Sequence, residues 1–319
     1  MQQEVMVGLD IGGTNSKIGM VTRTGELLIH GSFPSQAEGT FEDFLRECKA
    51  YFEDLCSQLP PDIAVLGVGI GAPDANQFTG HMHHPVNFKW GEEIPLVEGI
   101  RDTLDIPAIV ANDANAAAVG EWLFGDARSL KDFIIVTLGT GVGGGIYTNG
   151  ELLLGKNSLA GEIGHMVSVP NGRKCNCGRN GCLETYASAT GLTRTALEWL
   201  PKYPKSILHE VPKGHLTSAH ITHAAAKGDQ LALEALEYTG EILGRRLADL
   251  VACFNPEAII LSGGLVAAGD WLLRPVKEHY EKELLPLFKD TCQIMVSRVH
   301  TANAAVLGAA AMAWREFGR

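Results

Sequence analysis

The sequence predicts an α/β protein of two domains built on one plan. The chain has 319 residues, which is long enough for two domains that each bury a core. Short β-rich runs separated by glycine-bearing turns occur at its start and again after residue 132. Residues 25–28 and 150–153 both read GELL within glycine-rich β-hairpins. A repeat of this kind indicates two domains of similar design.

The first half of the chain predicts a β-meander followed by alternating helices and strands. Residues 5–10, 17–22 and 26–33 have the composition of short strands. A capping box at residues 40–43 opens a helix whose apolar residues keep helical spacing until Pro60 and Pro61. Residues 64–71 and 108–113 then predict two further strands, of which the first is buried, and residues 114–123 predict a helix.

The second half restarts the pattern. Residues 133–138 predict a strand, residues 139–145 a glycine-rich turn and residues 144–154 a second hairpin. Amphipathic helical stretches cover residues 219–254 and 270–287, and residues 304–317 predict a helix of small residues that could pack closely. We expect one domain at residues 1–118 plus 301–319 and the other at 119–300, with hinges near 115–125 and 298–308.

Composition excludes several function classes. Lys and Arg total 26 against 37 Asp and Glu, for a net charge of −11, which argues against a nucleic-acid partner and suits a small-molecule enzyme. The N-terminus lacks a signal-peptide pattern and no apolar run reaches membrane length, so we expect no membrane partner and a cytoplasmic location. Seven cysteines, an odd number without a secretion signal, speak against a disulfide framework.

Residues 10–17 (DIGGTNSK) form the first candidate phosphate loop. A strand delivers Asp10 into a turn made by Gly12, Gly13 and Thr14. Glycines allow positive φ and close backbone approach, so the N–H groups can converge on a phosphate. Asn15 and Lys17 could donate further hydrogen bonds together with Thr14, and Asp10 could hold Mg²⁺ through water. An ordinary β-turn explains Gly-Gly-Thr equally well.

The second candidate phosphate loop is residues 139–145 (GTGVGGG), which include Thr140 and Gly141. It contains a G-x-G-x-x-G pattern, but a dinucleotide site requires a helix directly after the loop. A hairpin follows here. The pattern therefore favours a phosphate loop between two strands, and a plain hairpin turn is the alternative.

Asp113 lies where a buried strand meets a helix, in the sequence VANDAN. A carboxylate at this junction is either a helix N-cap or a site residue at the carboxyl edge of a sheet. Its position between two phosphate loops favours the second interpretation. A hydroxyl that attacks a γ-phosphate needs a proton acceptor within hydrogen-bond reach, and an aspartate supplies one.

A cysteine cluster predicts a metal site. His165 is followed by Cys175, Cys177 and Cys182, with glycines that bend the loop between them. Three thiolates and one imidazole fit a closed, tetrahedral, structural Zn²⁺ site, with chance clustering as the alternative. Glu162 and Glu184 flank the cluster; they are either solvated surface acids or acceptors for sugar hydroxyls.

Taken together, these motifs resemble the ROK family of bacterial sugar kinases and repressors, within the actin-like ATPase superfamily. The resemblance covers essentially the whole chain, and GEIGH combined with CxCGxxGCxE is its most specific part. The matching segments are DIGGTNSK (10–17), GVGIGAPD (67–74), VANDANAAAVGE (110–121), TLGTGVGGGIY (137–147), GEIGH (161–165), CNCGRNGCLE (175–184), IILSGGL (259–265) and AAVLGAAAMA (304–313).

The resemblance implies a two-domain actin-like ATPase (ribonuclease H-like) fold with a cleft between the domains. It implies a homodimeric, ATP-dependent hexose kinase that transfers the γ-phosphate to the 6-hydroxyl of glucose, with ATP, Mg²⁺ and structural Zn²⁺ as cofactors. Kinases for fructose, mannose, N-acetylmannosamine or N-acetylglucosamine share the same motifs. Repressors of the family carry an additional N-terminal DNA-binding domain, for which we expect no room before the first strand.

The resemblance also assigns roles to residues. It implies that Asp113 is the catalytic base and that His165 and the three cysteines hold zinc. Gly263 and Gly264 would lie near the adenosine, and Asn87 matches a sugar-contacting asparagine loosely, because its surroundings (HMHHPVNFKW) depart from the family pattern. The sugar-binding residues implied by the resemblance are Gly71, Asn87, Asn112, Asp113, Glu162, His165 and Glu184.

Overall fold

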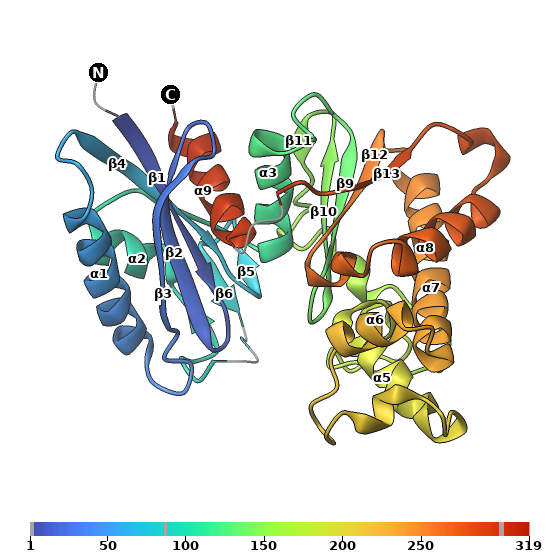
Figure 1. Cartoon of the computed structure of the whole chain (residues 1–319). Coiled ribbons are helices and arrows are strands. Elements are labelled where there is room, and N and C mark those ends of the chain that lie inside the picture. Colours follow the sequence, from blue (N-terminus) through green and yellow to red (C-terminus); the bar gives the residue numbers. More distant parts are fainter. Residues whose placement is uncertain (1–2, 84, 86–87, 300–302, 319) are drawn as a thin grey trace. The chain divides into compact units, whose positions relative to one another are not determined.

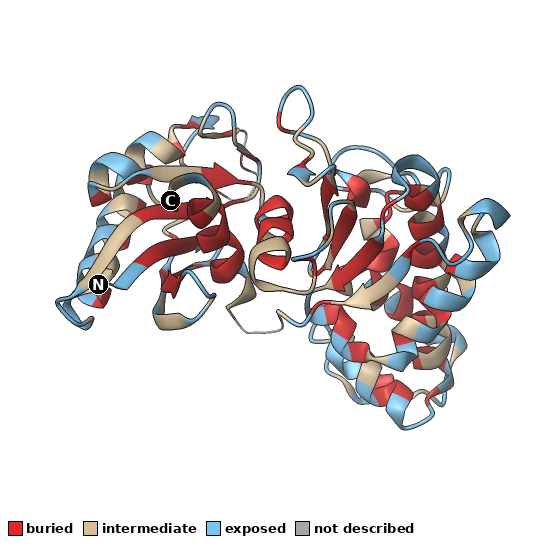
Figure 2. Cartoon of the chain, turned by 90° about the horizontal axis from the view of Figure 1, so that it is seen from above, coloured by how far each residue is buried: buried red, intermediate tan, exposed pale blue. Residues whose placement is uncertain are grey.

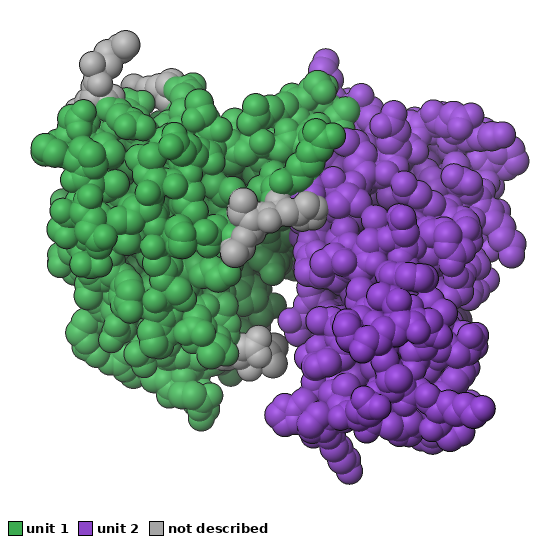
Figure 3. Space-filling view, viewed as in Figure 1, with its two compact units in different colours: residues 1–130, 152–160, 298–319 green, residues 131–151, 161–297 purple. Residues whose placement is uncertain are grey.

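The computed structural model describes residues 3–83, 85, 88–299 and 303–318. The chain divides into two compact units (Figure 3). Unit 1 contains residues 1–130, 152–160 and 298–319, and unit 2 contains residues 131–151 and 161–297. The domain boundaries expected from the sequence, at residues 118 and 301, stay a prediction.

Unit 1 is built on a five-stranded sheet of order β3-β2-β1-β4-β8 (Figure 1). The strands β1 and β2 and the strands β2 and β3 pair antiparallel, whereas β4 pairs parallel with both β1 and β8. A small second sheet has the order β5-β6-β7. The strands are β1 (Gln3–Ile11), β2 (Asn15–Thr22), β3 (Leu27–Pro34), β4 (Ile63–Gly71), β5 (Ala75–Asn76), β6 (His81–His83), β7 (Glu93–Ile94) and β8 (Ala108–Ala111).

Helices cover both faces of the unit 1 sheet, so its central strands are buried (Figure 2). Alternate residues of β1 point to opposite faces: Val5, Val7 and Leu9 pack in the core that contains α1 and α2, while Met6 packs with α9. The Thr40 capping box that opens α1 is confirmed. The helices of this unit are α1 (Phe41–Ser57), α2 (Leu96–Leu104), α3 (Asp113–Phe124) and α9 (Ala304–Phe317).

The small residues of α9 allow a very close approach to the sheet and to α3. A Cβ on Gly8 would lie 2.0 Å from the carbonyl oxygen of Val306, and one on Gly69 would lie 1.8 Å from that of Ala309. A Cβ on Gly120 of α3 would likewise lie 3.0 Å from the Cα of Gly308. The expectation of a closely packed small-residue helix is therefore confirmed.

Unit 2 repeats the topology of unit 1. Its sheet has the order β11-β10-β9-β12-β13. When the strands of each five-stranded sheet are numbered in chain order, both sheets have the order third, second, first, fourth, fifth. The strands β9 and β10 pair antiparallel, and β12 pairs parallel with β9 and β13. The duplication inferred from the two hairpins is confirmed. The strands are β9 (Phe133–Leu138), β10 (Val142–Thr148), β11 (Glu151–Leu152), β12 (Ala258–Ser262) and β13 (Gln293–Val296).

The helices of unit 2 differ in detail from the sequence expectation. The stretch 219–254 is two helices, because the chain turns at Gly228, where φ is +79°, and Asp229 caps the second helix. The predicted glycine-rich turn is also shorter than expected, since Val142 already begins β10. The α-helices are α4 (Glu184–Ala187), α5 (Ala189–Trp199), α6 (Ser218–Ala226), α7 (Gln230–Phe254) and α8 (Asp270–Glu283). Across the described residues, none of the helices combines the length and apolarity that crossing a bilayer requires.

Candidate functional site

The carboxyl ends of three parallel strands in unit 1 bring predicted site residues to one edge of the sheet. Asp10 on β1 is the register partner of Gly71 on β4, and Gly71 is the partner of Ala111 on β8. Asn112 and Asp113 follow directly where β8 ends. Ligands of open α/β sheets bind at this edge. The edge therefore presents two carboxylates beside a glycine-lined strand end.

The turn between β1 and β2 lies at the same edge. A Cβ on Gly12 would meet the carbonyl oxygen of Asn15 at 2.8 Å, so glycine is required for the chain to turn this tightly. The carbonyl of Thr14 accepts a hydrogen bond of 3.0 Å from the backbone N–H of Ser35, which fixes the turn against β3. Lys17 is the register partner of Asp10 across the hairpin. Gly13, Thr14 and Asn15 remain at the surface.

At the junction of β8 and α3, the residue that caps the helix and the candidate site residue Asp113 are two different, neighbouring residues. Asn112 is the N-cap: its Oδ1 accepts a hydrogen bond of 2.9 Å from the backbone N–H of Ala114. Asp113 is the first helical residue, and its Oδ1 accepts from the same N–H at 2.8 Å. Because Asn112 caps the helix, the Asp113 carboxylate is exposed and available to another group.

Burial and the neighbouring charge of Asp113 both disfavour the ionised form of Asp10. Burial and, second, the charge of Asp113 raise the pKa of Asp10 to about 6, although Lys17 opposes both effects. Desolvation by the surrounding protein raises the pKa of the Asp113 carboxyl as well, whereas the backbone hydrogen bonds of Ala114 and of Asp113 itself lower it. Paired, perturbed carboxylates at a sheet edge are typical of a functional site.

The carboxyl edge of the unit 2 sheet carries the second set of predicted residues. Loop 139–141 follows β9, and Gly263 and Gly264 follow β12, the parallel neighbour of β9. Gly263 has a φ of +97°, and a Cβ there would lie 2.6 Å from the carbonyl oxygen of Leu138. The two loops therefore lie against each other, and Thr140 stays exposed between the strands.

Glu184 lies directly beside the loop 139–141. A Cβ on Gly141 would come within 2.8 Å of the Glu184 Oε2 atom. The other oxygen, Oε1, accepts a hydrogen bond of 3.0 Å from the Cys175 thiol and lies 3.9 Å from His165 Nδ1. The opposite ring nitrogen, His165 Nε2, is 3.9 Å from the Glu162 carboxylate. The phosphate loop, both glutamates and the histidine thus form one continuous cluster in unit 2.

The four predicted metal ligands converge. One ligand atom from each of His165, Cys175, Cys177 and Cys182 lies within 4.8 Å of the others. The Cys177 and Cys182 sulfurs are 3.6 Å apart, as are the Cys175 sulfur and His165 Nδ1. Ligand atoms about 2.0–2.3 Å from one Zn²⁺ in a tetrahedron are separated by roughly 3.3–3.8 Å. The cluster therefore has the donor set and the size of a closed zinc site.

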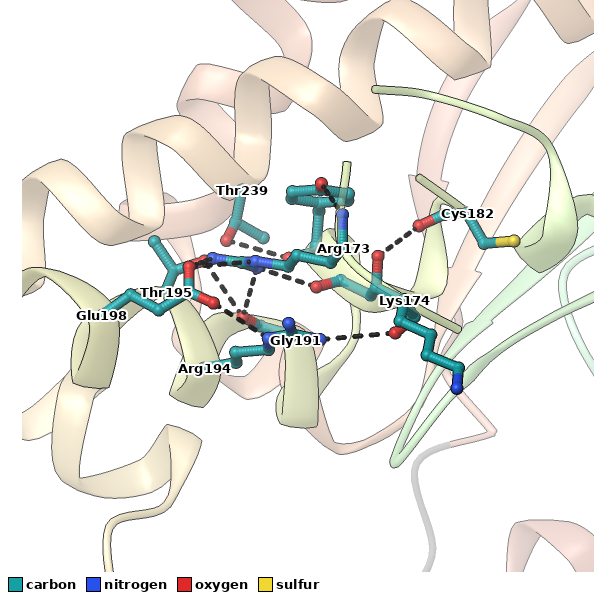
Figure 4. A network of polar contacts seen from close by, with 10 residues as sticks. Arg173, Lys174, Cys182, Gly191, Arg194, Thr195, Glu198 and Thr239 are labelled. Carbon is teal, nitrogen blue, oxygen red and sulfur yellow. Dashed lines mark hydrogen bonds and ion pairs between the residues drawn. The ribbon is translucent and has the colours of Figure 1, made fainter. Parts of the chain in front are cut away.

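The residue Arg173, which the sequence did not single out, anchors the cysteine loop (Figure 4). Its backbone N–H donates to the Tyr186 hydroxyl at 2.8 Å, and its guanidinium lies over the Tyr186 ring at 4.5 Å. The same guanidinium donates to the Thr195 hydroxyl, to the Glu198 carboxylate and to backbone carbonyls of residues 185 and 191. A single arginine inside a polar loop carries no sequence signal that would predict this network.

Two further outcomes concern asparagines. Asn87, which loosely matches the sugar-contacting asparagine that the resemblance implies, lies outside the described residues. The buried amide of Asn115, two positions after Asp113, was missed; in the described part of the chain its Oδ1 has no hydrogen-bond partner. The motif VANDAN contains this asparagine, but sequence alone does not show that its oxygen is buried.

Comparison with known proteins places these features in context. The model of the ROK family matches residues 6–316. A glucokinase from Halalkalibacterium halodurans is 37% identical over 313 residues, covering 97% of this chain and 94% of that protein. The N-acetylglucosamine repressor from Escherichia coli O157:H7 is 30% identical over 314 residues, covering 97% of this chain and 75% of the repressor. The structure of a ROK glucokinase from Streptomyces griseus, in complex with glucose and AMPPNP, matches with a TM-score of 0.82 and 31% identity, covering 97% and 98% of the two chains.

Proposed function

The chain belongs to the ROK family and has its two-domain actin-like fold, and from that premise we propose that it is an ATP-dependent hexose kinase that phosphorylates glucose on the 6-hydroxyl. The observation that carries the proposal is the pair Asp10 and Asp113 beside a tight glycine turn at the carboxyl edge of one sheet. Relatives named glucokinase, 37% and 32% identical over nearly the full chain, support the choice of glucose.

Asp113 is the proton acceptor in this proposal. Phosphoryl transfer depends mostly on positioning and electrostatics, but the sugar hydroxyl must lose a proton as it attacks. The Asp113 carboxylate is exposed, and Asn112, not Asp113, is the N-cap of α3. Asn112 keeps its amide NH₂ group for a neighbouring sugar hydroxyl while its oxygen caps α3.

The β1–β2 turn and the loop 139–141 are the proposed phosphate contacts. Their glycines leave backbone N–H groups accessible to phosphate oxygens, and Lys17 adds positive charge beside Asp10. Burial and the neighbouring charge of Asp113 raise the pKa of Asp10, and a bound cation offsets both effects, so the residues fit the Mg²⁺ that accompanies ATP. Mg²⁺, when bound, neutralises charge on the phosphates. Gly263 and Gly264, with no side chains to obstruct it, are proposed to border the nucleoside.

Zinc fits the Cys₃His cluster in donor type and in spacing. Burial raises the pKa of the Cys175 thiol, so a bound metal ion would displace a proton that the free protein retains. Zinc, when bound, supplies a rigid tie and no open coordination position. His165 would bind through Nδ1, the nitrogen nearer to the cysteines, and its Nε2 would then face the sugar with Glu162, while Glu184 approaches from the opposite side.

Two alternatives follow from the same comparisons. The acceptor is another hexose or an N-acetylhexosamine, because a repressor of N-acetylglucosamine is 30% identical. The second alternative is a sugar-sensing regulator without kinase activity, since a ROK transcriptional regulator matches with a TM-score of 0.88 and 26% identity. We further propose a homodimer that acts in the cytoplasm, in hexose metabolism such as glycolysis.

The test is ADP release measured with ATP, Mg²⁺ and a panel of hexoses and N-acetylhexosamines. The proposal predicts sugar-dependent ADP formation with the highest kcat/KM for glucose, and glucose 6-phosphate as the product by mass and NMR. A higher kcat/KM for another sugar replaces the acceptor but keeps the kinase. Sugar binding by calorimetry without any ADP release would instead establish the sensing function.

A further inference from the structure

In unit 1, two histidines of the stretch that departs from the family pattern, His81 and His83, lie beside the carboxylate of Glu93. His81 and His83 are alternate residues of β6, so both point to the same face of the small sheet. Met82 between them and its register partner Ile94 are buried on the opposite face. Glu93 on β7 is the register partner of His83, which brings its carboxylate to the histidine face.

The three side chains converge on one carboxylate oxygen. Glu93 Oε1 lies 2.8 Å from His81 Nδ1 and 4.0 Å from His83 Nδ1. The other ring nitrogen of His83, Nε2, is 3.2 Å from the Thr79 hydroxyl. Metal-bound histidines commonly hold their second ring nitrogen in such a hydrogen bond, which fixes the ring and directs the first nitrogen to the metal. Both Nδ1 atoms therefore face Glu93.

The distances match a metal site after a small adjustment. Nitrogen and oxygen ligands at about 2.0–2.2 Å from a tetrahedral ion lie roughly 3.3–3.6 Å apart, and the observed separations of 2.8 and 4.0 Å lie on either side of this range. The imidazole centroids are 6.0 Å apart, so both rings can reach one ion by rotation about their side-chain bonds. The side chains are 32%, 35% and 60% exposed, which leaves access for an ion and room for water ligands.

We propose that His81, His83 and Glu93 bind a divalent transition-metal ion, such as Zn²⁺ or Ni²⁺, at a site separate from the Cys₃His cluster. Two imidazoles and one carboxylate suit these ions better than Mg²⁺ or Ca²⁺, which prefer oxygen ligands. The ion would connect β6 to β7 through side chains and so stabilise the small sheet. Because its ligands are exposed, this site exchanges its ion with solvent. His84 lies outside the described residues.

The test uses the full chain with its native metal content and Ni²⁺ as the probe. Calorimetry should show saturable binding of one equivalent, and Ni²⁺ should raise the melting temperature, because a ligand that binds only the folded state stabilises it. The double variant His81→Gln/His83→Gln should lose both effects. The matched control His30→Gln/His223→Gln removes two exposed histidines from β3 and α6 and should retain both.

A second readout uses wild-type protein, so it does not depend on whether the double variant folds. In wild-type protein with ¹⁵N-labelled histidine, substoichiometric Ni²⁺ should broaden two imidazole signals first, assigned to His81 and His83 by single glutamine variants. The proposal is overturned if Ni²⁺ binds the double variant as tightly as wild type. It is equally overturned if the first signals to broaden belong to other histidines, His165 included.

Discussion

An alanine at position 141 should separate sugar binding from folding. The added Cβ would stand 2.8 Å from Glu184 Oε2, whereas ordinary contacts begin near 3.4 Å, so the carboxylate must withdraw by about 0.6 Å. The obstructing atom is the end of a flexible side chain, so the fold can accommodate it. The carboxylate must then leave its present position, where its other oxygen lies 3.0 Å from the Cys175 sulfur.

The size of the effect follows from the proposed hydrogen bond between the Glu184 carboxylate and a glucose hydroxyl, which is lost when the carboxylate moves. A hydrogen bond between a charged carboxylate and a hydroxyl contributes about 1.5–3 kcal/mol, so Gly141→Ala should weaken glucose binding by roughly 10- to 100-fold. The melting temperature should fall by no more than about 2–4 °C, which corresponds to about 1 kcal/mol in a chain of this size. Gly139→Ala is the matched control in the same loop, because among the described residues no atom beyond its chain neighbours lies within 4 Å of the added Cβ.

The assay is calorimetric titration with glucose in the absence of nucleotide, together with thermal unfolding. Leaving nucleotide out ensures that a change in the phosphate contacts of the loop does not enter the result. The reasoning is refuted if Gly141→Ala binds glucose as wild type does. It is also refuted if Gly139→Ala loses as much affinity, because the cause would then lie in the loop backbone and not in Glu184.

Three further predictions test packing, metal and charge. Gly69→Ala should destabilise the protein by about 3–5 kcal/mol or prevent folding, because its Cβ would lie 1.8 Å from a backbone oxygen of α9; denaturant unfolding measures this. Cys177→Ser should lose zinc by elemental analysis and bind glucose at least tenfold more weakly, with nucleotide affinity nearly unchanged. Asp10→Asn should stabilise the protein without Mg²⁺ at pH 8 and not at pH 3. The pKa of Asp10 is raised from 3.8 to about 6 in the folded state, so its ionisation costs stability progressively as pH rises from about 4 to 6 and fully above that.

Each of these has a result that contradicts it. A Gly69→Ala protein as stable as wild type would mean that α9 packs less closely than described, and Gly139→Ala serves again as the unobstructed control. Normal glucose affinity in a zinc-free Cys177→Ser protein would reduce the metal to a loop tie without influence on the sugar site. If Asp10→Asn were equally stabilised at both pH values, the charge of Asp10 would not be the cause of the stabilisation.

The sequence predicts most of the architecture because local patterns and the fold agree. The capping box at Thr40, the duplicated hairpins and the small-residue helix are each encoded within a few consecutive residues. The cysteine cluster is predictable for the same reason, since its spacing is short and its donor set is specific. These features need no knowledge of distant contacts.

What the sequence could not predict depends on tertiary contacts. Val142 enters β10 because it pairs with Leu138, although its glycine neighbours favour a turn. The anchoring role of Arg173 requires that α4 and α5 pack beside the cysteine loop, and its partners Tyr186 and Glu198 follow it by 13 and 25 residues. The shared carboxylate of Glu93 depends on strand register, which the sequence of β6 alone does not determine.

The most direct test of the proposed function is the turnover of Asp113→Asn. Asparagine keeps the shape of the side chain but cannot accept the proton of the attacking hydroxyl. We predict that kcat for glucose-dependent ADP release falls by about 10²–10⁴, as general-base removal does, while the calorimetric affinity for glucose stays close to wild type. A variant with near-normal kcat would contradict the assignment of Asp113 as the base and, with it, the proposed chemistry at the carboxyl edge of the first sheet.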